Sequence, residues 1–164
     1  MPLLVALSWW GTLLANVAAW AAIHAGSGYL VHRIPLERLQ RDGPLLRPRR
    51  WEHDGRTYER RLRIQRWKDR LPEAGAVFTG GVSKRRLPGS ARREGLARFV
   101  AETRRAERGH WLALAGGPLF ALWNPPSGVL LMTAYGLVVN APFIAVQRYN
   151  RQRGQRILAR RPPP

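Results

Sequence analysis

Two long stretches without charged side chains divide this chain of 164 residues. Residues 3–31 and 111–147 contain no Asp, Glu, Lys or Arg, although these residue types form 23% of the sequence. Because a charge is costly inside a bilayer, uncharged runs of this length are typical of membrane-spanning helices. The pattern therefore predicts a mainly α-helical integral membrane protein, a single membrane domain over residues 1–164 with about three apolar helices.

The first uncharged run, residues 3–31, is predicted to be the first span. A helix rises about 1.5 Å per residue, so the run is long enough for the roughly 30 Å hydrocarbon layer. A cleaved signal peptide is the alternative, because small residues follow the apolar core, although no basic segment precedes it. Trp9, Trp10 and Trp20 are expected at the two membrane interfaces, and Asn16 is expected to face protein instead of lipid.

The second uncharged run contains a strong helix breaker. Residues 111–123 are too few for an ordinary span and are followed by Asn-Pro-Pro-Ser, so they form either a short second span or half of a re-entrant hairpin. Residues 128–147 are long enough to be a third span. Within it, the Asn-Ala-Pro sequence of residues 140–142 is expected to bend the helix and to free a backbone carbonyl.

The charged side chains are strongly biased towards basic residues. The sequence has 28 Lys and Arg against 10 Asp and Glu, which gives a net charge of +18. The basic residues lie in residues 32–110, a predicted interfacial segment, and in residues 148–164, a predicted basic tail. Because basic loops stay on the cytoplasmic side, both are expected to face the cytoplasm in a multi-pass protein of the cell membrane. Basic residues that flank apolar spans suit anionic lipid head groups better than nucleic acid, which is not expected as a partner.

The interfacial segment is predicted to contain several short elements. In residues 51–58, Asp-Gly between aromatic residues indicates a small hairpin. In residues 59–71, apolar residues share one helical face, which predicts an interfacial helix, with an ordinary solvated helix as the alternative. Residues 75–89 read as a basic loop without a phosphate-binding pattern. A long helix is expected to start near Ser90 and to continue through His110 into the second apolar run.

The candidate site lies where this long helix changes from charged to apolar sequence. On a helix, Glu107 and His110 share one face with four mostly apolar residues, Leu96, Phe99, Val100 and Thr103. A spacing of three residues lets Glu107 contact His110. Trp111 begins the apolar run, which places the pair at the membrane surface, where a neutral imidazole can act as a base. The alternative is an interfacial His-Trp anchor.

The sequence offers little support for other kinds of catalytic site. It contains no Cys, and its four His lack a metal-ligand spacing, so neither thiol chemistry nor a metal site is expected. The acyltransferase pattern His-x-x-x-x-Asp and the hydrolase pattern Gly-x-Ser-x-Gly are both absent. The alternative function is therefore a non-catalytic membrane scaffold whose basic loops bind lipid or the acidic surface of a partner enzyme.

Several short motifs, in order along most of the chain, resemble those of the glycosyl-4,4'-diaponeurosporenoate acyltransferase family. They are Arg33-Ile-Pro35, Arg66-Trp-Lys68, Glu102-Thr103, Arg105-Ala-Glu107, His110-Trp111, Asn140, Pro142 and Gln147-Arg-Tyr-Asn-Arg151. The resemblance implies a small bacterial membrane enzyme of carotenoid biosynthesis, which esterifies a sugar hydroxyl of a glycosylated carotenoid acid or related glycolipid with a fatty acyl group. It also implies an acyl donor such as acyl-CoA or acyl carrier protein as co-substrate, and no further cofactor.

With this resemblance, the motif residues receive candidate roles. His110 is expected to remove the proton from a sugar hydroxyl, Glu107 to orient the imidazole, and the hydroxyl to attack an acyl thioester. The predicted substrate-binding residues are Arg105, Gln147, Arg148, Tyr149, Asn150, Glu102 and Asn140.

Some of these residues have alternative roles. Arg105 and Arg148 suit either the phosphates and oxyanion of the acyl donor or the phosphates of lipids. Tyr149 suits either the sugar or the aromatic belt of the membrane. Glu102 is expected to pair with Arg105, three residues further on, and Asn140 to cap a broken backbone if it does not contact substrate.

Overall fold

The computed structural model describes residues 5–72 and 93–160, and these residues form helices and connecting segments without a strand. The three long helices are α1 (Trp9–His32), α3 (Arg93–Ala115) and α4 (Pro126–Arg160). The short elements are η1 (Leu36–Leu39), η2 (Arg50–Gly55), α2 (Arg56–Arg60), η3 (Ile64–Arg66), η4 (Lys68–Arg70) and η6 (Gly117–Leu122). The prediction of a mainly helical protein is confirmed for the described residues.

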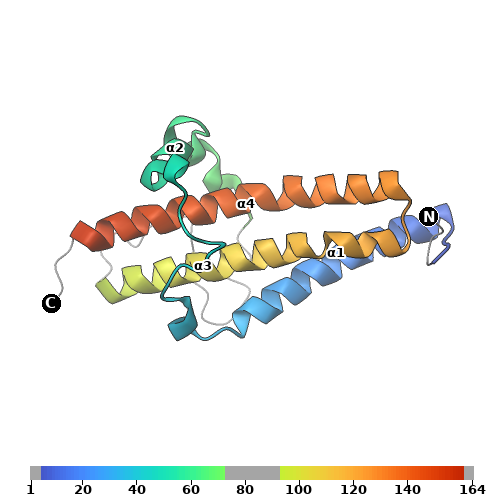
Figure 1. Ribbon diagram of the computed structural model, residues 1–164, viewed down its shortest axis with the longest axis horizontal. Coiled ribbons are helices and arrows are strands. Elements are labelled where there is room, and N and C mark those ends of the chain that lie inside the picture. The colour runs from blue at the N-terminus through green and yellow to red at the C-terminus, as the bar shows by residue number, and fades with distance from the viewer. Residues whose placement is uncertain (1–4, 73–92, 161–164) are drawn as a thin grey trace.

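The long helices lie lengthwise beside one another, as Figure 1 shows. Helix α3 runs in the opposite direction to α1 and α4, and packs against both. Glycines allow the close approach. A Cβ on Gly154 of α4 would lie 2.6 Å from Cγ2 of Val100 on α3, and a Cβ on Gly136 would lie 2.6 Å from Cη2 of Trp20 on α1. The three helices are therefore held together by direct contact between side chains and helix backbone.

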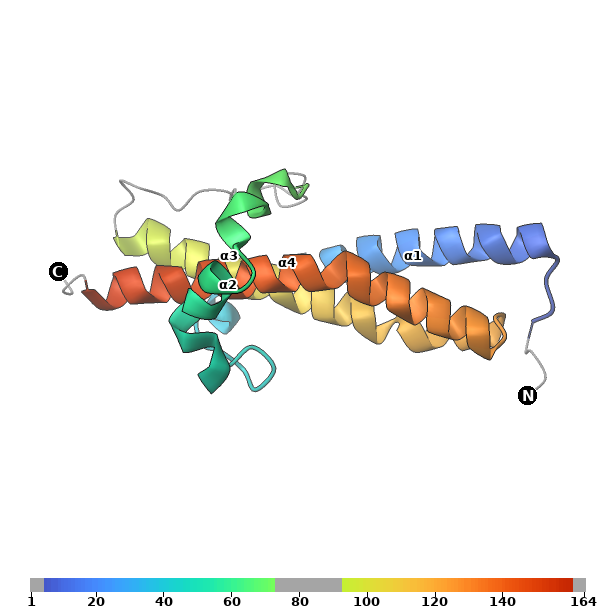
Figure 2. The same cartoon turned by 90° about the horizontal axis from the view of Figure 1, so that it is seen from above.

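Helix α3 continues from the charged segment into the apolar run as far as Ala115, which confirms the predicted continuous helix through His110. Its predicted start near Ser90 and the predicted loop at residues 75–89 lie outside the described residues. Residues 111–123 are thus the end of α3 together with η6, and α4 begins directly after Asn124 and Pro125. Pro142 lies inside α4, whose axis changes direction partway along its length in Figure 2.

The molecule has an apolar half, formed by α1, the end of α3, η6 and the start of α4. Large apolar side chains are exposed on this half, and among them are Leu14, Val17, Leu130 and Val138, each more than 60% exposed. By length and composition, α4 is the one described helix able to cross a membrane. Association with a membrane is therefore supported, whereas the number of spans stays a prediction.

The other half is polar and holds the connector, residues 33–72, against the helical pair. In Figure 2 the connector lies across α4, and η1 packs on α3 while η2 packs on α4. Leu39 and Leu46 of the connector are almost completely buried. The segment is therefore folded onto the helices and is more than a surface link.

The predicted hairpin at residues 51–58 is wrong, because these residues form η2 and α2. Asp54 and Gly55 do take left-handed backbone angles, with φ of 55° and 89°. The flanking residues nevertheless coil, since Glu52 and Tyr58 both turn inwards and are buried. The Tyr58 hydroxyl donates to Oε1 of Glu52 at 2.8 Å, which closes the turn from inside.

The predicted continuous helix over residues 59–71 is also wrong. The chain is interrupted at Arg63, whose φ of 47° cannot continue a right-handed helix. The interruption lets Ile64 pack into a cluster with Tyr58, Val146 and Tyr149. Burial of this apolar group against α4 outweighs the helical periodicity of the segment.

Two further predictions about single positions can be compared with the fold. Asn16 faces protein, as predicted, because its amide and that of Asn124 exchange hydrogen bonds at 2.8 and 3.2 Å. Trp9 and Trp10 are exposed, but Trp20 is buried against Phe120 and Tyr135, so it is a packing residue and not an interfacial anchor.

The predicted basic tail is largely the second half of a helix. Residues 148–160 continue α4, and residues 148–152 are buried. The physical reason is that Arg148 and Arg151 find carboxylate partners on α3 and on the connector, so these cations face inwards instead of solvent.

Candidate active site

The predicted apolar face of α3 is the face that packs on α4. Leu96, Phe99 and Val100 form a buried cluster with Ile157 and Leu158 of α4. Thr103 and Glu107 continue this face and are completely buried, and His110 follows at intermediate exposure. The face therefore leads from an apolar contact, through a buried carboxylate, to a partly accessible imidazole at the start of the apolar half.

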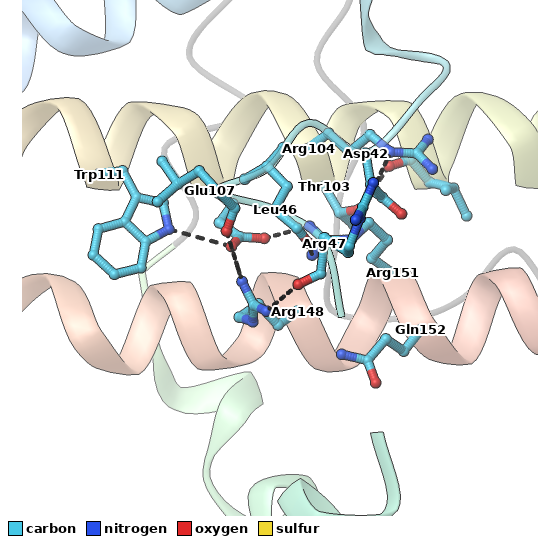
Figure 3. A network of polar contacts seen from close by, with 12 residues as sticks. Asp42, Leu46, Arg47, Thr103, Arg104, Glu107, Trp111, Arg148, Arg151 and Gln152 are labelled. Atoms are coloured by element: carbon cyan, nitrogen blue, oxygen red, sulfur yellow. Dashed lines mark hydrogen bonds and ion pairs between the residues drawn. The ribbon is translucent and has the colours of Figure 1, made fainter. Parts of the chain in front are cut away.

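Glu107 is the centre of a buried ion network between α3, α4 and the connector (Figure 3). Its Oε1 accepts from NH1 of Arg148 at 2.7 Å and from the indole nitrogen of Trp111 at 3.2 Å, and its Oε2 accepts from NH1 of Arg151. Both carboxylate oxygens are thus bound by cationic or indole donors. This arrangement gives Glu107 a structural role, and its predicted role of orienting His110 stays a prediction.

Arg148 joins two carboxylates that are far apart in the sequence. Its Nε donates to Oε1 of Glu52 at 2.6 Å, and its terminal nitrogens donate to Glu107 and to the carbonyl oxygens of Leu45 and Arg47. Every nitrogen of the guanidinium is therefore used within the protein. Arg148 links the connector to α3 and α4, and its predicted role in binding the acyl donor stays a prediction.

The Glu52 carboxylate is held ionised inside the protein. Burial alone would raise the pKa of Glu52, but hydrogen bonds from Arg148, from the Arg49 backbone N–H and from the Tyr58 hydroxyl outweigh burial and lower this pKa below its ordinary value. Gln152 of α4 also donates to Oε2, at 2.7 Å. Conversely, burial and the neighbouring carboxylate raise the pKa of the Tyr58 hydroxyl.

Asp42 ends the network near the start of the connector. Its Oδ1 accepts from Nε of Arg104 at 2.7 Å and lies 3.3 Å from Nε of Arg151. Burial opposes ionisation of Asp42, but the hydrogen bonds from Arg104 and Gln155 and the charge of Arg151 lower the pKa of Asp42 overall. A second part of the connector is thereby fixed to both α3 and α4.

His110 contacts two side chains of α4. Its Nδ1 lies 2.9 Å from Oδ1 of Asn140, and its ring stacks on Phe143 with centroids 4.8 Å apart and planes 14° from parallel. Asn140 is completely buried, and its Nδ2 donates to the carbonyl oxygen of Gly136 at 2.9 Å. The imidazole is therefore fixed at its edge and at one face, at the junction between the polar and apolar halves.

Two other predicted site residues, Arg105 and Tyr149, make contacts within the protein. Arg105 pairs with Glu102 at 3.2 Å, as predicted, and donates to the Ile34 carbonyl at 2.9 Å, which ties α3 to the end of α1. Tyr149 is buried, and its hydroxyl accepts from Gln65 at 3.1 Å. At about 100° per residue, Tyr149 lies on the face of α4 opposite Asn140, so it contacts the connector and is neither beside His110 nor in an aromatic belt.

Gln147 and Asn150 are buried on the α4 helix as well. Gln147 shares the face of Asn140, because the two are seven residues apart. Its Oε1 is a buried acceptor without a hydrogen-bond partner within the described residues. Of the predicted substrate-binding side chains, Gln147 therefore combines a place on the His110 side of α4 with an unused polar atom.

Sequence reasoning did not identify Asp42, Glu52, Arg151 or Phe143 as residues of the site region. Arg151 belongs to a quoted motif but received no role, and a run of Arg gives no local sign of which members face inwards. Glu52 lay within the incorrectly predicted hairpin. Backbone turns with positive φ, as at residues 53–55, and ion pairs between distant residues produce no periodic pattern in the sequence. These partners could therefore be identified only from the folded structure.

No group of three or more His, Cys, Asp or Glu side chains able to hold a metal ion occurs in residues 5–72 and 93–160. The His110 imidazole and the Asn140 amide beside it are groups that suit proton transfer and hydrogen bonding.

Comparison with known proteins gives a consistent family. Residues 42–160 match the family model described as glycosyl-4,4'-diaponeurosporenoate acyltransferase. A protein of that name from Staphylococcus haemolyticus is 29% identical over 141 residues, which cover 85% of this chain and 81% of the relative. A protein of the same name from Staphylococcus aureus strain USA300 is 25% identical over 140 residues, which cover 85% of this chain and 83% of the relative.

No solved structure matches the chain. The family match covers residues 42–72 of the connector together with α3 and α4, and thus includes every residue of the ion network as well as His110 and Asn140. The match extends over well more than half of the sequence. The chain is therefore an acyltransferase that belongs to the glycosyl-4,4'-diaponeurosporenoate acyltransferase family.

Proposed function

We propose that this acyltransferase esterifies a sugar hydroxyl of a glycosylated carotenoid acid, or of a related glycolipid, with a fatty acyl group. The names of the matched family and relatives, which specify a glycosyl-diaponeurosporenoate, support this acceptor. The acyl donor is a thioester, acyl-CoA or acyl carrier protein, and serves as co-substrate. No further cofactor takes part.

The observation that carries the proposal is the position of His110. It lies where the charged part of α3 ends and the apolar half begins, and it is partly exposed while its neighbours on the same face are buried. An acceptor with an apolar tail and a sugar head has its hydroxyls at this level of a membrane, whereas a thioester donor arrives from the aqueous side. This position supports the proposal that His110 acts where the two substrates meet.

In the proposed reaction, His110 is the general base. It takes the proton of the sugar hydroxyl as the hydroxyl oxygen attacks the thioester carbonyl carbon, which forms the ester C–O bond. The C–S bond then breaks, and the imidazolium returns its proton to the leaving thiolate. Gln147 accepts a hydrogen bond from a second sugar hydroxyl through its buried Oε1. Atoms and charge balance without a covalent acyl-enzyme.

The proposed location is the cell membrane, with several spans and with the basic half on the cytoplasmic side. The exposed apolar side chains of α1 and of the first half of α4 support burial of both helices in lipid. Anionic head groups then surround the exposed Arg side chains of the connector, such as Arg50, Arg56 and Arg66.

The proposal is tested by mass spectrometry of pigments and polar lipids from a host that makes a glycosylated carotenoid acid. The host receives wild-type protein, His110→Ala or His53→Asn, at equal membrane levels. His53 is an exposed histidine with φ of 46°, a conformation that Asn also adopts, so His53→Asn is a matched control.

We expect a mass increase of one acyl group with wild type and with His53→Asn, and a loss of roughly 100-fold or more in the rate with His110→Ala. Acylation by His110→Ala at the wild-type rate would remove the base from the mechanism. Absence of acylation with every protein would reject this acceptor.

A further inference from the structure

Asn140 is a polar side chain that contacts the proposed base, His110. We infer that Asn140 is a positioning residue, which fixes His110 in the tautomer that carries its proton on Nδ1 and its basic lone pair on Nε2. This inference rests on the proposed function for its catalytic meaning, and on the hydrogen-bond geometry for the tautomer itself.

The orientation of the Asn140 amide follows from its other partner. The carbonyl oxygen of Gly136 can only accept, and it lies 2.9 Å from the nitrogen of the amide. The opposite orientation would place two oxygens against each other in a buried position. The atom that Asn140 presents to His110 is therefore Oδ1, which is an acceptor.

The orientation of the amide decides the tautomer of the imidazole. Oδ1 of Asn140 lies 2.9 Å from Nδ1 of His110, so Nδ1 must carry the hydrogen for this contact to be favourable. In a neutral imidazole the second nitrogen, Nε2, then holds the lone pair. Phe143 stacks on the ring and Asn140 is completely buried, so neither group is free to turn away.

This arrangement also explains why Glu107 need not orient the base. A carboxylate at Nδ1 would raise the pKa of the imidazole and favour its protonated form, whereas a neutral amide selects the same tautomer without adding charge. The charge of Glu107 is instead neutralised by Arg148 and Arg151. The neutral orienting group therefore selects the Nδ1–H tautomer and leaves the lone pair on Nε2.

The first test measures the tautomer directly. Histidine labelled with ¹⁵N is incorporated into the full chain in detergent micelles, and the signals of His110 are assigned by comparison with His110→Ala. We expect neutral His110 of the wild type to carry its proton on Nδ1, and Asn140→Ala to populate the Nε2–H form. Observation of Nε2–H as the main form in the wild type would overturn the inference, whatever the activity.

The second test separates positioning from packing by kinetics with acyl-CoA and a host-made glycosylated carotenoid acid. Asn140→Ala is expected to lower kcat roughly 10- to 100-fold with little change in KM for the donor. Asn140→Asp retains an acceptor at Nδ1, so it should keep the Nδ1–H tautomer and recover part of kcat. Its negative charge should raise the pKa of His110 and shift the acid limb of the kcat profile to higher pH.

Thr133→Ala is the matched control, because Thr133 also donates a side-chain hydrogen bond to the carbonyl four residues earlier on α4 but is exposed. It should leave kcat unchanged. A wild-type kcat in Asn140→Ala would contradict the inference, and so would equal damage by Asp and Ala without a shift of the pH profile. If no protein transfers an acyl group, the proposed function fails while the tautomer measurement still decides the inference.

Discussion

At the scale of single residues, the structure gives Glu107 and His110 different partners, although the sequence places both on one face of a helix. Glu107 and His110 are three residues apart, yet the carboxylate serves the ion network and the imidazole bonds to Asn140. Spacing on a helix shows which side chains are able to meet, but the neighbouring helix decides which partner wins. Two arginines of α4 provide stronger partners for a buried carboxylate than a neutral imidazole does.

Replacement of Glu107 by Gln tests this division of roles. The change leaves Arg148 and Arg151 with less compensating charge in a buried site, which is expected to cost roughly 3 to 5 kcal/mol and to lower the thermal unfolding midpoint by about 6 to 20 °C. The midpoint is measured in detergent micelles by circular dichroism. The folded fraction is expected to keep the wild-type dependence of kcat on pH, since His110 and Asn140 are unchanged.

Glu37→Gln is the control for this change, because Glu37 is an exposed acidic residue of η1. It should leave the unfolding midpoint within about 1 °C, as exposed charges contribute little. A normal midpoint in Glu107→Gln combined with a shifted kcat profile would return Glu107 to a catalytic role.

At the scale of elements, the sequence was sufficient for the long helices and insufficient for the connector. Uncharged runs and the face of Leu96, Phe99 and Val100 predicted α1, α3 and α4, because long helices follow from periodicity and composition. The short elements of residues 50–70 depend on contacts with α4, such as Ile64 with Tyr149 and Glu52 with Arg148. Such contacts join positions more than 80 residues apart, so no local pattern records them.

The same distinction applies to the candidate site. The position of His110 at the junction and its suitability as a base followed from the change in composition, and the reaction it is expected to assist followed from the family resemblance. The orienting role proposed for Asn140 could be inferred only from the packing of α3 on α4, which approach each other closely at Gly154. The sequence thus identifies the candidate reactive group, His110, and the structure identifies the side chains that contact it, Asn140 and Phe143.

Gly154→Ala tests how closely α3 and α4 approach. An added Cβ would lie 2.6 Å from Cγ2 of Val100, a short and stiff side chain, so the helices must shift apart. We expect a loss of roughly 1 to 3 kcal/mol in the free energy of unfolding, measured by denaturant titration in mixed micelles.

Two further variants distinguish steric overlap from a general effect of Ala. Gly26→Ala lies on α1 with open space around its Cβ and should be neutral or slightly stabilising. Val100→Ala combined with Gly154→Ala should recover part of the lost stability, because the clashing methyl group is removed. An additive loss in the double variant would argue against direct contact.

At the scale of the whole molecule, the surface of one half suits lipid and the surface of the other half suits water. The apolar half exposes Leu and Val side chains of α1 and α4 and Trp side chains of α1, whereas the polar half buries its ion network and exposes Arg. The junction between them passes close to His110. A membrane boundary at this level would bury the exposed apolar side chains in lipid and leave the exposed Arg side chains in water. It would also place the connector and the first part of α3 on the same side of the membrane.

The orientation can be tested directly because the chain has no Cys, so single-Cys variants report without background. Ser127 is exposed at the start of α4, and Arg50 is exposed on the connector. With three complete spans, Ser127→Cys reacts with an impermeant maleimide in intact cells, and Arg50→Cys reacts only after lysis. Protection of Ser127→Cys in intact cells would instead support a re-entrant α3–α4 hairpin, since the loop would then not reach the outer surface. Labelling of Arg50→Cys in intact cells would contradict the cytoplasmic placement of the basic half, and with it the access of a cytoplasmic acyl thioester to His110.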